Sequence, residues 1–83
     1  MIDEKIIKAI FSNYSIDEVI FIKESSFFSF IICSMNENIS LDRWNNLENI
    51  LKEYTSNEVS LLSLEQALKY LGNEYISKGV IIK

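Results

Sequence analysis

The sequence contains two nearly continuous runs of β-branched and aromatic residues that lie close together in the chain. Val19–Ile22 is wholly apolar, and Phe27–Cys33 is interrupted only by Ser29. Runs of this composition are typical of strands that are buried on both faces. The link between them, residues 23–26, is short and polar, which predicts a hairpin. Because buried strands need a covering layer, the hairpin is expected to belong to a sheet with helices packed on it.

Three further segments carry apolar residues at three- and four-residue spacings, which predicts three amphipathic helices. The stripes are Ile2, Ile6, Ile7, Ile10, Phe11 and Tyr14; then Leu41, Trp44, Leu47, Ile50, Leu51 and Tyr54; then Leu64, Ala67, Leu68, Leu71 and Tyr75. Ser40 is placed to cap the second helix, and Ser63-x-x-Gln66 has the pattern of a capping box for the third. Glu48 and Lys52 form an i,i+4 pair that is expected on the exposed side of the second helix.

Two shorter segments complete the predicted order. The weak alternation of Glu58–Leu62 predicts a short strand, and Val80–Ile82 predicts a last strand after a stop at Gly79. Asn36-Glu37-Asn38 is expected to be a loop. The result is α-β-β-α-β-α-β over residues 1–83, one α/β (α+β) domain with a mixed sheet packed by helices.

Missing residue types exclude much of the usual catalytic chemistry. There is no His, so no imidazole base, no Ser-His-Asp triad and no His-ligated metal site is available. Gly72 and Gly79 are the two glycines of the chain, too few for a P-loop or a GxGxxG phosphate cradle. Cys33 is the single cysteine, which excludes an intramolecular disulfide and a multi-Cys zinc site. Its place in an apolar run predicts a core thiol.

The charge pattern indicates which partners to expect. With a net charge of −4, one arginine, Arg43, and seven scattered lysines, the chain has no basic stripe for nucleic acid. No segment reaches the ~18 consecutive apolar residues of a membrane span. The first residues are acidic, unlike a signal peptide, so a cytoplasmic protein is expected. Acidic pairs at Asp3-Glu4 and Asp17-Glu18, and the lone Glu58, fall at predicted element ends, where solvated carboxylates are common.

From Val19 to Lys83 the chain resembles the minimal nucleotidyltransferases of the DNA polymerase beta superfamily. In that family a strand ending in Gly-Ser is followed by a second strand with a Ser-Asp-x-Asp motif, a helix, a Val-Asp-Leu-Val strand, and a closing helix and strand. The segments that carry the resemblance here are Val19–Ile22, Ser26–Ile32, Ile39–Trp44, Val59–Leu62 and Ser77–Ile82. The resemblance implies a nucleotidyltransferase-like fold.

The functional motifs of that family are absent. Phe27 and Ser29 stand where the resemblance places the two metal-binding aspartates, and Ser60 stands where it places the third carboxylate. The Gly-Ser turn is missing as well. Nucleotidyl transfer of this kind needs two divalent ions held by carboxylates and substrate phosphates, and a serine hydroxyl supplies no charge for them. Phe27 is expected to fill the vacated cleft, with no metal or cofactor bound.

These observations lead to one hypothesis and two alternatives. The resemblance implies an inactive nucleotidyltransferase-like domain that acts as a protein-binding or structural module, with a HEPN-type helical partner in a toxin–antitoxin-like pair. Edge strands near Val59 or Val80 are candidate surfaces for self-association. One alternative is a divergent nucleotide-binding enzyme that uses Glu24, Glu37 or Glu58. The other is a small acidic inhibitor that acts by surface mimicry, which fits the acidic charge and which a contiguous acidic patch would favour.

Overall fold

A computed structural model describes residues 4–14, 16–35 and 39–82. The elements are α1 (Glu4–Phe11), β1 (Ile16–Lys23), β2 (Phe28–Met35), α2 (Leu41–Thr55), β3 (Glu58–Ser63), α3 (Leu64–Tyr70), α4 (Asn73–Ile76) and β4 (Val80–Ile81). The strands form one mixed sheet in the order β3-β2-β1-β4. β1 is antiparallel to both of its neighbours, and β2 is parallel to β3. The predicted class, a mixed sheet with helices packed on it, is confirmed.

The central hairpin forms as the two apolar runs predict. β1 extends beyond its run at both ends, whereas β2 begins at Phe28, one residue after the start of its run, and continues to Met35. β1 and β2 pair antiparallel from Lys23↔Ser29, next to the turn, to Ile16↔Met35 at the far end. The register is irregular between Ile16 and Glu18. The turn is closed by Ser25, whose Oγ accepts hydrogen bonds from the backbone N–H groups of Phe27 and Phe28 at 3.2 and 3.1 Å. Local hydrogen bonding by a serine side chain is a common way to fix such a turn.

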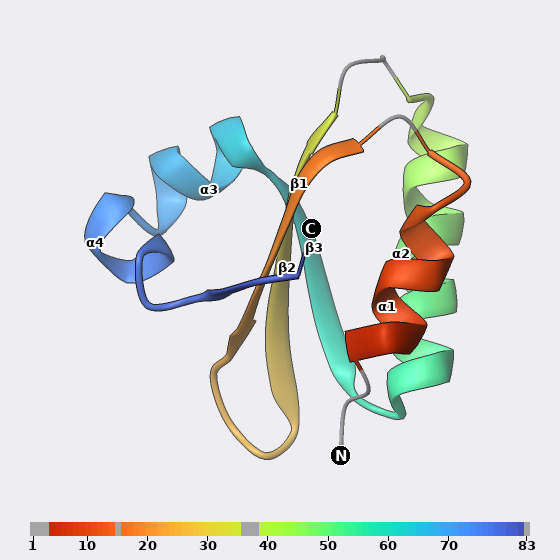
Figure 1. Ribbon diagram of the computed structural model, residues 1–83, viewed down its shortest axis with the longest axis horizontal. Helices are drawn as coiled ribbons and strands as arrows, with labels where there is room; N and C mark the ends of the chain where they lie inside the picture. Colours follow the sequence, from red (N-terminus) through yellow and green to blue (C-terminus); the bar gives the residue numbers. More distant parts are fainter. Residues whose placement is uncertain (1–3, 15, 36–38, 83) are drawn as a thin grey trace.

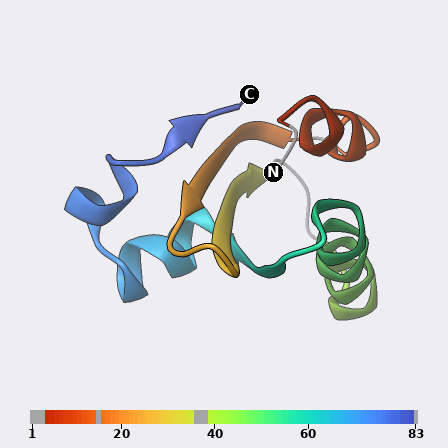
Figure 2. The ribbon, with the colours of Figure 1, turned by 90° about the horizontal axis from the view of Figure 1, so that it is seen from below.

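Helices cover both faces of the sheet, which explains why the hairpin strands are apolar on both sides. α1 and α2 lie against one face, and α3 and α4 against the other (Figures 1 and 2). The first core, on the α1/α2 side, consists of Ile7, Phe11, Ile16, Val19, Ile31, Cys33, Leu47, Leu51, Val59 and Leu61. The second core, on the α3/α4 side, consists of Ile20, Ile22, Ile32, Ala67 and Ile76. Trp44 packs half-buried against the first core, as its stripe predicts.

Both predicted helix starts are confirmed. Ser40 Oγ accepts a hydrogen bond from the N–H of Arg43 at 3.3 Å. α2 begins at Leu41, the residue after Ser40. Ser63 and Gln66 form a reciprocal capping box at the start of α3, with bonds of 3.1 and 3.2 Å. Because each of these caps is made within four residues of chain, the local sequence is sufficient to predict it.

The last helical segment differs from the prediction. The stripe predicts one helix, but α3 and α4 are separate, and the chain breaks at Gly72 with φ 86° and ψ 157°. This region of backbone conformation is nearly exclusive to glycine. Leu68, placed on the apolar stripe, is 43% exposed. The element order therefore contains one helix more than predicted.

The first helix and the last strand both end earlier than predicted. Within the described residues α1 begins at Glu4 and ends at Phe11, although Tyr14 still packs against the first core. β4 comprises only two residues, but the N–H of Ile82 donates to the carbonyl of Val19 at 2.8 Å. The predicted loop at residues 36–38 lies outside the described residues. In the part of the chain that is described, no helix has the length and apolar character needed to span a bilayer.

Candidate functional site

The three positions singled out by the nucleotidyltransferase resemblance do not come together. β2 and β3 pair with Ser29 opposite Val59 and with Phe30 opposite Ser60. Because successive side chains of a strand point to opposite faces, Ser29 faces the first core and Ser60 faces the second. Phe27 lies in the hairpin turn and is 79% exposed, so the expectation that it fills a cleft is wrong.

Ser29 is fully buried, and its Oγ has no hydrogen-bond partner among the described residues. Its neighbours on the same face of the sheet are Ile31 in β2, Val59 in β3 and, directly opposite in β1, Lys23. A buried hydroxyl without a hydrogen-bond partner carries a desolvation cost that nothing offsets. This position is a packed part of the first core, not an opening to solvent.

The two described glutamates of the alternative enzyme hypothesis, Glu24 and Glu58, are engaged at separate places. Glu24 accepts a hydrogen bond from the hydroxyl of Tyr75, and Glu58 lies 3.8 Å from the ammonium of Lys52. Glu37 lies outside the described residues. Among the residues that the structure describes, no group of three or more acidic or Cys side chains is arranged to hold a metal ion. Burial raises the pKa of the Cys33 thiol to about 12, as expected for a core thiol.

The two edges of the sheet differ, and the β3 edge is partly covered by side chains of α2. The backbone N–H of Leu61 donates to Glu48 Oε2 at 3.1 Å, so a side chain from α2 satisfies a group that an edge strand normally leaves open. Lys52 lies 3.5 Å from Glu48 and 3.8 Å from Glu58, which adds charged side chains at this edge. The predicted Glu48–Lys52 pair is confirmed. Glu48 was expected on the exposed side of the helix, but its carboxylate also accepts a hydrogen bond from the sheet.

The opposite edge, at β4, is apolar and open. Val80 is 50% exposed and Ile81 is 66% exposed. β4 pairs with β1 through Ile20↔Ile81 and Phe21↔Val80, and Ile82 donates to Val19. In an antiparallel ladder hydrogen-bonded pairs alternate with non-bonded pairs. The N–H and C=O of Ile81 therefore point away from β1, toward the free edge.

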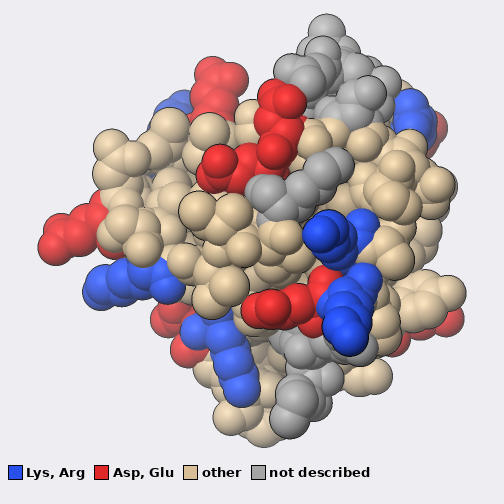
Figure 3. Space-filling model, in the orientation of Figure 1, with Lys and Arg blue, Asp and Glu red and all other residues tan. Residues whose placement is uncertain are grey.

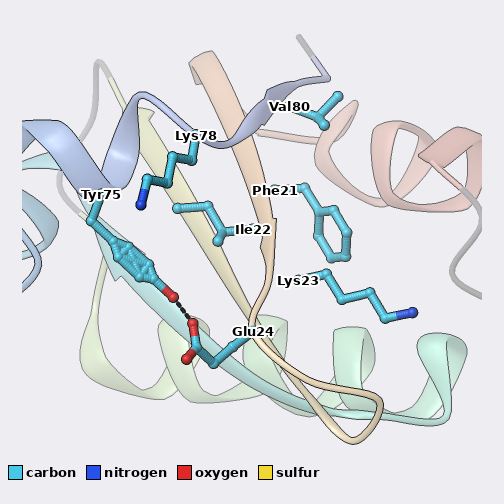
Figure 4. Close-up of a pocket in the computed structure, with 7 residues that line it drawn as sticks. All are labelled: Phe21, Ile22, Lys23, Glu24, Tyr75, Lys78 and Val80. Carbon is cyan, nitrogen blue, oxygen red and sulfur yellow. Dashed lines mark hydrogen bonds between the residues drawn. The ribbon is translucent and has the colours of Figure 1, made fainter.

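β1 continues past the end of β4, and a recess of about 540 Å³ lies where the two strands part. By the same alternation the backbone N–H and C=O of Lys23 point toward this recess. Within the described residues, β4 supplies no residue to pair with Lys23. The lining consists of apolar Phe21, Ile22 and Val80 and polar Lys23, Glu24, Tyr75 and Lys78 (Figure 4).

The recess carries a local excess of positive charge on an acidic chain. Figure 4 shows Lys78 extending over Ile22 on the same side as Tyr75, while Lys23 points to the other side of β1. The one carboxylate, Glu24, is already bonded to Tyr75. On the face with β4 in front, both acidic and basic side chains of the described residues are present (Figure 3).

A second apolar surface lies in a groove of about 700 Å³ between α1 and α2. Ile6 and Ile50 are each more than one-third exposed there, and Tyr54 is 62% exposed. The groove contains one acid, Glu53, and is lined by residues of α1 and α2 and by Asn13 and Tyr14, which follow α1. Because most of its lining is helical, it offers a partner fewer backbone hydrogen-bonding groups than the β4 edge does.

The sequence indicated part of this site. The strand at Val80 was expected to be an edge, and the sheet order confirms it. The lysines beside it were missed because Lys23 and Lys78 are 55 positions apart in the chain and line one recess only through the β1–β4 pairing. Comparison with protein-family models, with curated proteins and with solved structures found no match.

Proposed function

We propose that the chain is a protein-binding module, without nucleotidyl transfer activity of its own, that adds a strand from a partner to its sheet at β4. The observation that carries the proposal is the contrast between the two sheet edges. Glu48 occupies a backbone donor of β3, whereas the outward N–H and C=O of Ile81 are accompanied by exposed apolar side chains. Natural sheets usually protect such an edge unless something pairs with it.

Strand addition suits the chemistry of this edge. Main-chain hydrogen bonds to Ile81 supply affinity, and the exposed side chains of Val80 and Ile81 offer apolar area on the two faces of the extended sheet. Burial of apolar surface stabilises the complex by about 25 cal/mol per Å², so both side chains contribute in addition to the backbone.

The absence of transfer activity rests on residue chemistry. Phe27, Ser29 and Ser60 offer no carboxylate to a divalent ion. The register supports no shared site for them, because β3 presents Val59 and Leu61, not Ser60, to the face that holds Ser29. The HEPN-type partner implied by the family resemblance stays a prediction, and the binding edge does not depend on it.

The test compares two substitutions at one position. Ile81→Pro removes the outward N–H but leaves the β1–β4 bonds in place, since proline is tolerated on an edge strand when its nitrogen faces solvent. Ile81→Thr keeps the N–H and the β-branched shape. The tagged full chain is purified from cells that make it naturally, and co-purifying proteins are quantified by mass spectrometry.

A partner bound at β4 is expected with the wild-type chain and Ile81→Thr. Its amount should fall about fivefold or more with Ile81→Pro, since one backbone hydrogen bond contributes about 1 kcal/mol. The amide spectrum away from β4 must remain that of the wild type. Equal recovery of every protein with both variants, or no specific protein with either, contradicts the proposal.

A further inference from the structure

The path of an added strand leads to the basic recess. A strand that pairs with Ile81 and continues in the direction of Val80 follows β1 from Ile20 toward Lys23. The chain of this protein turns away at that point, because the N–H of Gly79 is bonded to Ile76. The incoming strand therefore arrives at the mouth of the recess lined by Lys23 and Lys78.

The recess fits a carboxylate. Both lysine side chains are exposed, and the neighbouring Glu24 accepts a hydrogen bond from Tyr75. The apolar side chains of Ile22 and Val80 form part of the wall and reduce solvent access to an ion pair. Two cations beside one engaged anion favour a negatively charged side chain on the partner.

A second copy of this chain is disfavoured at this edge in the parallel arrangement. Parallel pairing of two β4 strands sets Lys78 beside its own counterpart. Like charges in neighbouring strands weaken strand pairing.

Resting on the proposed function, we propose that the partner of the β4 edge is an extended acidic peptide segment. An apolar residue of this segment pairs beside Ile81, and two successive acidic residues farther along reach Lys78 on one face of the sheet and Lys23 on the other. Because successive side chains of a strand point to opposite faces, neighbouring acidic residues can serve these two lysines.

The experiment titrates the ¹⁵N-labelled full chain with three short blocked peptides. In the first, pairs of Val alternate with pairs of Glu, so that both residue types occur on both faces of the strand; in the second, Lys replaces every Glu; in the third, Pro replaces a central Val of the acidic peptide. The first peptide is expected to shift the amide signals of Ile81 and Lys78 and to slow hydrogen exchange at Ile81 by about tenfold at saturation. The lysine and proline peptides should leave Ile81 unchanged.

A charge reversal provides the matched control. Lys78→Glu should weaken the acidic peptide about fivefold and give the lysine peptide measurable binding, whereas Lys69→Glu on α3 should do neither. Added salt should weaken the acidic complex of the wild-type chain.

Equal binding of the acidic and lysine peptides overturns the acidic specificity. Binding of the acidic peptide without any change at Ile81 overturns strand addition by this segment. If either occurs while a natural partner still depends on Ile81 in the co-purification, the proposed function stands and only this inference fails.

Discussion

Ser29 is the residue whose chemistry fits its surroundings least. Its hydroxyl is fully buried and unbonded among the described residues, so replacing the hydroxymethyl group by a methyl group removes a desolvation cost and leaves a space of only one oxygen atom. Ser29→Ala should therefore raise the free energy of unfolding by about 1 kcal/mol, measured by urea denaturation.

Ser34→Ala is the control for this substitution, since Ser34 lies half-buried in the same strand, β2. It should change the free energy of unfolding by less than about 0.5 kcal/mol. A destabilised Ser29→Ala variant means that the hydroxyl does have a partner in solution.

The buried thiol of Cys33 links stability to alkaline pH. Burial raises its pKa to about 12 in the folded chain, against about 9 when exposed, so the folded state keeps a proton that the unfolded state releases. Stability is consequently lost as the pH rises from about 9 toward 12. In Cys33→Ala, the unfolding free energy should fall with pH less steeply than in the wild type, by up to about 1.4 kcal/mol per pH unit in this window. Parallel pH profiles for the two proteins contradict a shifted thiol.

At the scale of elements, the β3 edge depends on one helix side chain. Glu48 accepts the N–H of Leu61 and lies near Lys52, so Glu48→Ala opens the edge and removes both contacts. A partly exposed contact of this kind contributes about 1 kcal/mol. The variant should lose about that much stability, and the amide of Leu61 should exchange faster. Glu53→Ala, farther along α2, is the control and should leave that amide unchanged.

How far the sequence predicts an element depends on the range of the interactions that define it. The caps at Ser40 and Ser63 and the hairpin turn are local, and the prediction succeeds there. The break at Gly72 was missed because the apolar spacing continues through it. The opposite orientations of Ser29 and Ser60 depend on the β2–β3 register, which joins segments separated by the whole of α2. For the same reason the recess at Lys23 and Lys78 had no signal in either segment alone.

At the scale of the whole molecule, the two sides of the sheet are unequal. Among the described residues the first core has ten buried members and the second has five. α2 has fifteen residues, whereas α3 has seven and α4 has four, with a glycine break between them. Short helices gain little stability of their own and depend on packing. The α3–α4–β4 segment is therefore expected to open more readily than the hairpin and α2.

Two core truncations test this asymmetry by native-state hydrogen exchange. Leu51→Ala in the first core should lower the protection of all slow amides together, with a loss of about 2–5 kcal/mol in global stability. Ile76→Ala in the second core should speed exchange mainly in α3, α4 and β4 and leave β1 and β2 close to the wild type. Because β4 ends this weaker segment, Ile76→Ala should also reduce binding of the acidic strand peptide, although Ile76 does not line the recess. If Ile76→Ala lowers protection uniformly, the two cores open as one unit, and binding at β4 is not coupled to a local equilibrium.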